Sequence, residues 1–297
     1  MAEEITPTQS DRVNLVYDSK ESDEVIQVEL PFKMLVLGDF TLDERSSYFE
    51  EQEAVVLNSK NLLIDVLFAQ LQPHLKLKVV NQMQDDDSEL LMEFEFNNLD
   101  DFSPTRILQN NDWMQKILQF TDVLAKSSDV SSVEVEEKDR EVIEAVLKIE
   151  GVTLDELKKQ SESFSWLISG IEQRVCAQLD EILHHPQFKA MESAWTALQF
   201  LIERTDFSEN CEIAVVNVSK QGLAEEFDDV PEISQSKYYQ LVYSEEFGQF
   251  GGRPYGAIIA NYEFSPRVAD VKLLQRLAGV SAVAHAPFIA AASAEFF

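Results

Sequence analysis

The pattern of apolar and polar positions is clearest in the C-terminal stretch of the chain. A glycine-rich turn there precedes a continuous apolar run, which predicts a buried strand over residues 257–264. Residues 268–284 then keep a helical period, and a second short strand is expected at Phe288. Such a strand, helix and strand cannot bury their sheet alone, so the upstream chain is expected to extend it. The apolar positions at helical spacing are Val271, Leu274, Ala278 and Ala282, flanked by Leu273, Leu277 and Val280.

The N-terminal part of the chain predicts further strands and helices. Val13, Leu15 and Tyr17 alternate with polar residues, and a charged turn at 18–24 separates them from a second apolar set, so a hairpin or two exposed strands are expected. Residues 34–37 form an unbroken apolar run and predict the first buried strand. The remaining elements expected here are a helix over 61–71, strands over 75–79 and 90–96, a helix after Pro104 and a helix over 112–126.

A stretch of small polar residues at 127–135 interrupts both periods and predicts a linker. We therefore divide the chain into a first domain over 1–126, a linker with short helices over 127–163 and a second domain over 164–297. The expected fold class is α/β, with mixed sheets flanked by helices. Beyond the linker we expect helices over 136–150, 153–160, 164–185 and 188–202, a strand over 213–218 and a helix over 238–243.

Composition narrows the class of protein. The 297 residues are 45% hydrophobic, enough for two packed cores. A net charge of −30 opposes binding to nucleic acid or anionic membranes, because that binding depends on Lys and Arg neutralising phosphates. Cys176 and Cys211 are too few for a disulfide framework and indicate a reducing compartment. Neither a signal peptide nor a membrane span is expected, so the expected location is the cytosol.

Several motifs resemble the contractile sheath proteins of type VI secretion systems. ELPFKMLVLGDF at 29–40 and NNLDDFSP at 97–104 look like the small sheath subunit, the TssB or VipA family, over residues 12–126. Other motifs resemble the N-terminal third of the large subunit, the TssC or VipB family, over residues 164–297. These are QLDEILHHPQFKAMESAWTALQFLIERTDF at 178–207, VVNVSK at 215–220, FGQFGGRPYGAIIANYEF at 247–264 and AHAPFIAAAS at 284–293.

The resemblance implies a structural protein with two sheath-subunit-like domains and no catalytic, cofactor or metal site. In that family the two subunits form a contractile tube around a secreted inner tube, so the implied partners are sheath subunits and the inner tube protein. Val13, Leu15 and Tyr17 resemble the N-terminal strand that the small subunit lends to a neighbour. Leu154 and Leu157 lie in GVTLDELKKQ, which is similar to the helix gripped by the ClpV-type AAA+ unfoldase.

The chain also departs from the family pattern. A small subunit would continue after Lys126 with further helices, and a large subunit would continue well beyond Phe297, so the chain looks like a truncated fusion of the two. Its role is expected to be that of a sheath component, and the alternatives are a sheath-binding adaptor or assembly modulator, or a fusion without function. The alternative from the enzyme class is a hydrolase using His285, although a histidine beside a proline is expected to pack in the core.

Each further candidate for chemistry has a structural alternative. FGGRPYG at 250–256 lacks the Lys and Ser/Thr of a nucleotide loop and precedes a strand, so a turn is expected instead. His184 and His185 are adjacent at a predicted helix end, which favours histidine without a metal. Cys211 opens an apolar strand and lacks the local signature of a nucleophile. Asp85–Asp87 lacks the spaced oxygens of a calcium loop. Since none of these candidates forms a catalytic arrangement, we expect no enzyme.

Overall fold

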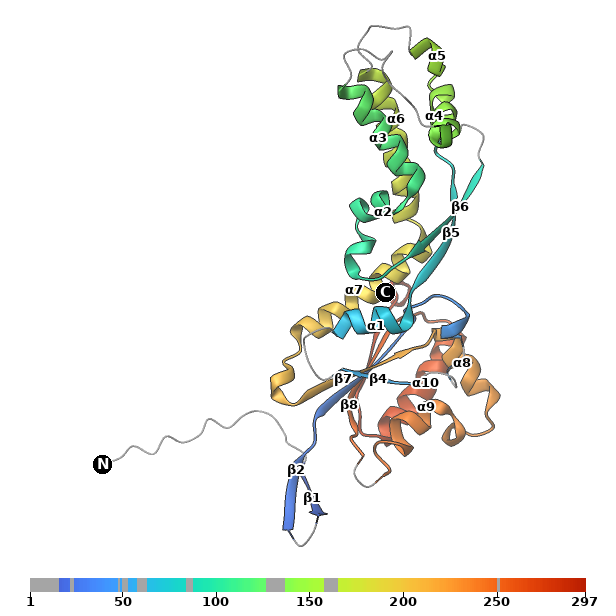
Figure 1. The fold of residues 1–297 in the computed structure, drawn as a ribbon. Helices are drawn as coiled ribbons and strands as arrows, with labels where there is room; N and C mark the ends of the chain where they lie inside the picture. The colour runs from blue at the N-terminus through green and yellow to red at the C-terminus, as the bar shows by residue number, and fades with distance from the viewer. Residues whose placement is uncertain are drawn as a thin grey trace, which may run out of the picture. The chain divides into compact units, whose positions relative to one another are not determined.

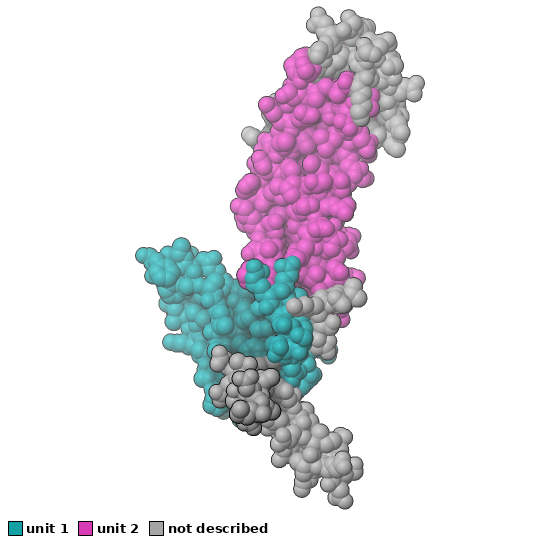
Figure 2. Space-filling model, turned by 90° about the vertical axis from the view of Figure 1, so that its left-hand side faces the viewer, with its two compact units in different colours: residues 1–38, 47–61, 201–297 teal, residues 39–46, 62–200 magenta. Residues whose placement is uncertain are grey.

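The chain forms two compact units in a computed structural model (Figures 1 and 2). Unit 1 comprises residues 1–38, 47–61 and 201–297, and unit 2 comprises residues 39–46 and 62–200. Each unit therefore contains residues from both sides of the predicted linker, and the division at 127–135 remains a prediction. Below, the N-terminal part means residues 1–126 and the C-terminal part means residues 164–297. The structure describes residues 16–21, 24–47, 49, 53–57, 63–83, 88–126, 137–157, 165–249 and 252–297.

Unit 1 is built around a five-stranded mixed sheet in the order β4-β7-β3-β8-β9. The central strand β3 (Phe32–Gly38) pairs in parallel with β7 (Cys211–Asn217) on one side and β8 (Tyr255–Phe264) on the other. β8 pairs in parallel with β9 (Phe288–Ala292), and β4 (Val55–Leu57) pairs antiparallel with β7. The first buried strand of the N-terminal part thus lies between two strands of the C-terminal part.

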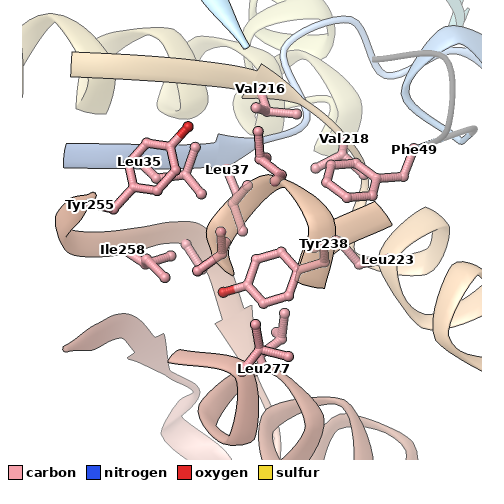
Figure 3. Close-up of a cluster of buried hydrophobic side chains, with 14 of the residues drawn as sticks. Leu35, Leu37, Phe49, Val216, Val218, Leu223, Tyr238, Tyr255, Ile258 and Leu277 are labelled. Atoms are coloured by element: carbon pink, nitrogen blue, oxygen red, sulfur yellow. The ribbon is translucent and has the colours of Figure 1, made fainter. Parts of the chain in front are cut away.

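The helices of unit 1 share one hydrophobic core with this sheet (Figure 3). Leu35 and Leu37 of β3 are fully buried in that core, together with Tyr238. Because residues two apart on a strand point to the same face, one face of β3 is covered by the helices. These helices are α8 (Lys220–Asp229), α9 (Lys237–Tyr239) with the π-helical turn that follows it (Gln240–Ser244), and α10 (Val268–Val283).

The expected N-terminal hairpin is present in unit 1. β1 (Val16–Glu21) pairs antiparallel with β2 (Glu24–Glu29), and the ladder extends to the pair Glu21 and Glu24. Residues 18–21 and Glu24, which we predicted as parts of a charged turn, therefore belong to the two strands. The prediction was wrong there because a ladder bonds main-chain groups and accepts charged side chains.

Unit 2 combines an antiparallel hairpin with helices. β5 (His74–Val80) pairs with β6 (Glu89–Glu95), and Leu75, Leu77 and Val79 are buried on one face as their alternation predicts. The helices are α1 (Leu63–Leu71), α2 (Pro104–Asn110), α3 (Asp112–Lys126), α4 (Glu137–Ile149), α5 (Leu154–Leu157), α6 (Ser165–Leu183) and α7 (Pro186–Arg204), whose end belongs to unit 1.

A buried core in unit 2 also joins the two parts of the chain. Ile117 and Phe120 of α3 lie in one cluster with Leu167, Ile171 and Val175 of α6. Each helix thus buries part of its apolar face against the other part of the chain. The separate parts therefore depend on each other in unit 2 as they do in the sheet of unit 1.

The helical period in α10 does not mark its buried side. Leu273, Leu277 and Val280 are buried. Val271 and Ala282, which we placed on the helical period, are exposed. Apolar residues lie on more than one side of this helix, so their spacing fits more than one face, and packing against the sheet decides between them.

Cutting the chain within 127–135 is expected to leave the two fragments associated, because both units contain core residues from each part. A protease site inserted in this segment should give two fragments that co-elute on gel filtration in native buffer. The same fragments should separate in denaturant. Separate elution in native buffer would show that each part folds alone and would contradict the shared cores.

Candidate functional site: the shared sheet and its charged cluster

Polar side chains form a row across the three central strands of the sheet in unit 1. Lys33 of β3 is in register with Glu212 of β7 and with Tyr255 of β8. All three residues are buried, with exposed fractions of 2%, 7% and 3% respectively. Lys33 is two residues before Leu35, so the row lies on the face that the helices cover.

Two ion pairs balance the charges of this row. The Lys33 Nζ lies 2.6 Å from Oε1 of Glu246, and the Arg253 Nη1 lies 2.6 Å from Oε1 of Glu212. The Arg253 backbone N–H also donates to Oε2 of Glu246 at 2.9 Å. We call Lys33, Glu212, Glu246 and Arg253 the charged cluster. Lys33 and Glu212 are the buried members, and each lies against an opposite charge, as buried charges require, whereas Arg253 is about half exposed.

Tyr255 lies beside the charged cluster as a neutral aromatic ring. Burial raises the pKa of its hydroxyl well above the ordinary value, and the carboxylates of Glu246 and Glu245 raise it further. The Lys33 Nζ lies 4.6 Å from the centre of the ring. Tyr255 therefore offers the lysine a cation–π contact and no charge.

A glycine turn brings Glu246 and Arg253 together. The Gly248 N–H donates to the backbone oxygen of Tyr243 at 2.6 Å, and the Gly252 N–H donates to that of Gln249 at 3.2 Å. The described residues thus support the predicted turn in place of a phosphate loop. A Cβ atom at position 252 would lie 2.1 Å from the backbone oxygen of Glu246, so this close approach requires glycine.

The substitution Gly252→Ala is therefore expected to lower the free energy of unfolding by about 1–3 kcal/mol. The matched control is Gly279→Ala in α10, where an added Cβ meets no heavy atom within 4 Å. That change should raise the free energy of unfolding by about 0.5–1 kcal/mol, because alanine is the better helix former. Urea unfolding followed by circular dichroism measures both. Equal effects of the two substitutions would contradict the close approach at position 252.

The predicted strand-exchange residues lie at the N-terminal hairpin. Tyr17 is in β1 and is in register with Val28 of β2. Val13 and Leu15 lie outside the described residues. Their role in contacting a neighbouring chain remains a prediction.

The predicted unfoldase handle begins with a capping box. The Thr153 hydroxyl accepts from the Glu156 N–H at 3.3 Å, and the Glu156 carboxylate accepts from the Thr153 N–H at 2.9 Å. Leu154 is only 9% exposed and packs in the core of α3, α4 and α6. Leu157 is the last residue of α5, and its side chain lies outside the description. Use of this segment as a handle remains a prediction, and it would require Leu154 to leave its core.

His285 is not the packed core histidine that we expected. It is exposed and has a φ of 55°, immediately after α10. Its N–H donates to Ala282 at 3.2 Å and the Ala286 N–H donates to Ser281 at 3.0 Å, the two bonds of a Schellman helix end. The expectation failed because His285, which follows the cap residue Ala284, takes the left-handed conformation that ends this helix, and its side chain is exposed there.

The remaining candidates for chemistry have structural contacts. The Nδ1 of His184 lies 2.9 Å from the backbone oxygen of Asp180, and His185 accepts from the Gln187 N–H at 3.3 Å, so both histidines complete the turn between α6 and α7. Asp85–Asp87 lies outside the described residues. Among the residues that are described, no three His, Cys, Asp or Glu side chains are grouped to hold a metal ion. No helix in the same ranges is long and apolar enough to cross a membrane.

Several large apolar side chains of α10 and β9 are exposed. Val268 is 85% exposed, Val283 is 46% exposed and Ile289 of β9 is 53% exposed. Within the described part of the chain, β9 pairs with β8 alone, so its other edge has no strand partner there. A free strand edge is a place where another chain can add a strand.

Two family models match consecutive parts of the chain. Residues 5–162 match "Type VI secretion system, VipA, VC_A0107 or Hcp2", and residues 165–297 match the VipB family, "EvpB/VC_A0108, tail sheath N-terminal domain". The chain is also 39% identical over 134 residues to the type VI secretion system sheath protein TssC1 of Pseudomonas aeruginosa. The aligned region covers 44% of this chain and 27% of that relative, so the chain spans about a quarter of the relative's length.

These matches confirm the resemblance that the motifs indicated, and the mixed sheet confirms the α/β fold class. Both families are structural sheath proteins without catalytic activity. The first match extends to residue 162 and so includes α4 and α5, beyond the end at 126 that the motifs suggested. The chain therefore belongs to the type VI secretion sheath proteins, with a VipA-type domain followed by the N-terminal sheath domain of the VipB type.

Proposed function

We propose that the chain is a structural component of the contractile sheath of a type VI secretion system, located in the cytosol. The observation that supports this role is the sheet of unit 1. There, β3 of the VipA-type domain lies between β7 and β8 of the VipB-type domain. One chain thus supplies the strands that two separate subunits would otherwise bring together, and it acts by assembly and not by catalysis.

The proposed partners are other sheath subunits, the inner tube protein and the AAA+ unfoldase. The free edge of β9 and the exposed Val268 and Ile289 suit the addition of a further strand. The net charge of −30 opposes close packing of identical copies. Assembly of this chain alone is therefore expected to increase with ionic strength, because salt screens that repulsion.

Electron microscopy of the labelled chain, alone and mixed with intact VipA-type and VipB-type sheath proteins, tests the proposal. Label along the length of the tubes would support a sheath component. Label at tube ends or on tube surfaces, without incorporation, would instead identify an adaptor or assembly modulator. The absence of label from tubes in every mixture and at every salt concentration would contradict both roles and favour a fusion without function.

The N-terminal strand provides a sharper prediction within this proposal. Leu15→Pro removes a main-chain donor and an apolar anchor from the predicted strand Val13–Tyr17, so it should weaken co-sedimentation with intact sheath by about tenfold or more. The control is Ser10→Pro, which places the same residue before the strand and should leave co-sedimentation unchanged. Equal sedimentation of both variants and the unmodified chain would show that this strand is not the attachment point.

A further inference from the structure

The apolar pattern of the central strands leaves their register open. Residues 34–37 of β3, 213–216 of β7 and 257–260 of β8 are apolar throughout. A slip of two residues would keep each side chain on its own face, so it would exchange one apolar contact for another. Where both faces of a strand are apolar, the alternation of apolar and polar residues does not fix the register, so another feature has to mark it.

The charged cluster provides such a mark at the N-terminal ends of the strands. Lys33 is the buried cation of β3, and its partner Glu246 and register neighbour Glu212 both belong to the VipB-type domain. At the other end of the ladder, the buried polar residue Asn217 is uncharged and is in register with Gly38. Charge therefore distinguishes one end of the three-strand ladder.

A slip of β3 would break the charged cluster. Moving β3 by two residues displaces Lys33 by about 6–7 Å along the sheet, which is too far to keep the 2.6 Å contact with Glu246. A slip of one residue would turn Lys33 to the opposite face of the sheet. Either slip leaves a buried lysine and a carboxylate without each other, and buried unpaired charges are strongly unfavourable.

We propose that Lys33, together with Glu246, Glu212 and Arg253, sets the register in which β3 of the VipA-type domain pairs with β7 and β8 of the VipB-type domain. The cluster selects the correct pairing of the two domains by penalising the alternatives. This role of the cluster concerns the folding of the chain, so it does not depend on whether the chain enters a sheath. Lys33 is then a specificity-determining residue for joining the two domains.

Disulfide trapping in the full chain tests the register directly. In a background of Cys176→Ser and Cys211→Ser, the pair Val36→Cys and Val215→Cys reports the observed register, since these positions are partners in the β3–β7 ladder. The pair Val36→Cys and Ile213→Cys reports a slip of two residues. Neighbouring strands bring paired positions within the Cα separation that a disulfide allows. Mild oxidation followed by peptide mass mapping measures the two products.

With the cluster intact we expect only the in-register disulfide. Lys33→Met should raise the yield of the slipped disulfide by at least about tenfold. The double variant Lys33→Met, Glu246→Gln should raise the yield of the slipped disulfide equally. It leaves no unpaired charge on Glu246, so it provides the test if the single variant does not fold. Lys33→Arg keeps the positive charge and should give only the in-register disulfide, as the unmodified lysine does. The control Lys76→Met, in the exposed pair with Glu93 at 2.8 Å, should have no effect.

If Lys33→Met and the double variant Lys33→Met, Glu246→Gln both gave only the in-register disulfide, the proposal would be overturned. Loss of folding in both variants without any slipped product would overturn it as well, because the cluster would then support folding without selecting the register. Slipped product in the Lys76→Met control would show that slippage does not depend on the cluster, which would equally count against the proposal.

Discussion

Replacing Trp195 with alanine is expected to lower the free energy of unfolding of unit 2 by about 3–5 kcal/mol. Trp195 lies in α7, is fully buried and stacks on Phe68 with ring centres 3.8 Å apart. Phe40 meets it edge to face at 5.4 Å. The indole N–H also donates to the backbone oxygen of Phe40 at 3.0 Å, and alanine would leave that oxygen without its donor.

Urea unfolding followed by far-ultraviolet circular dichroism measures this loss. Trp166→Ala in α6 is the matched control, because Trp166 is 53% exposed and its removal should change the free energy of unfolding by less than about 0.5 kcal/mol. Trp195→Phe should give an intermediate loss, since it keeps an aromatic ring but not the N–H. A loss below about 1 kcal/mol for Trp195→Ala would show that the site repacks around alanine.

The location of this cluster gives the substitution a second consequence. Trp195 belongs to the VipB-type domain, and its partners Phe40 and Phe68 belong to the VipA-type domain. Its loss should therefore weaken the association of the two fragments obtained by cleavage within 127–135. The same side chain then contributes to stability and to the union of the two domains.

Most helices and strands of this chain could be predicted from the spacing of apolar residues. The runs at 34–37, 213–218 and 257–264 became β3, β7 and β8, because strands covered on both faces need no polar positions. Long amphipathic periods likewise became α3, α6 and α7. These elements carry a strong local signal that tertiary packing does not reverse.

The elements that were missed carry little local signal. β4 has three residues, which are too few to show alternation, and it exists through its pairing with β7. α8 contains mostly polar residues, and few apolar side chains, among them Leu223 and Phe227, face the core. Both elements depend on contacts with distant parts of the chain, which spacing along the sequence does not report.

The charged cluster could not be predicted for a related reason. Lys33 stands at the start of an apolar run, where a lysine is normally a solvated strand end. Its burial follows from the approach of Glu246, which is 213 residues away and reaches Lys33 only through the glycine turn before β8. The glycine pattern predicts that turn, but spacing along the sequence does not indicate which strand lies beside it.

Gln178 joins the two domains through main-chain groups in unit 2. It lies in α6 and is fully buried. Its Nε2 donates to the backbone oxygen of Val80 at 3.0 Å, and its Oε1 accepts from the Gln82 N–H at 2.9 Å. The side-chain amide thus bonds the chain at the end of β5 as a neighbouring strand would. Gln178→Leu removes both bonds and should lower the free energy of unfolding by about 2 kcal/mol.

Gln178→Glu should make the stability of unit 2 depend on pH. A protonated carboxyl can still donate to Val80 and accept from Gln82, so the variant should resemble the unmodified chain near about pH 4.5. Burial raises the carboxyl pKa in the folded state, and the folded chain then holds its proton more tightly than the unfolded chain, so stability falls as pH rises. Each unit by which burial raises this pKa corresponds to a loss of about 1.4 kcal/mol near pH 8. Gln173→Glu on the exposed side of α6 is the control and should show no such dependence on pH. If the difference in stability between Gln178→Glu and the unmodified chain were the same at both pH values, this side chain would not hold the end of β5.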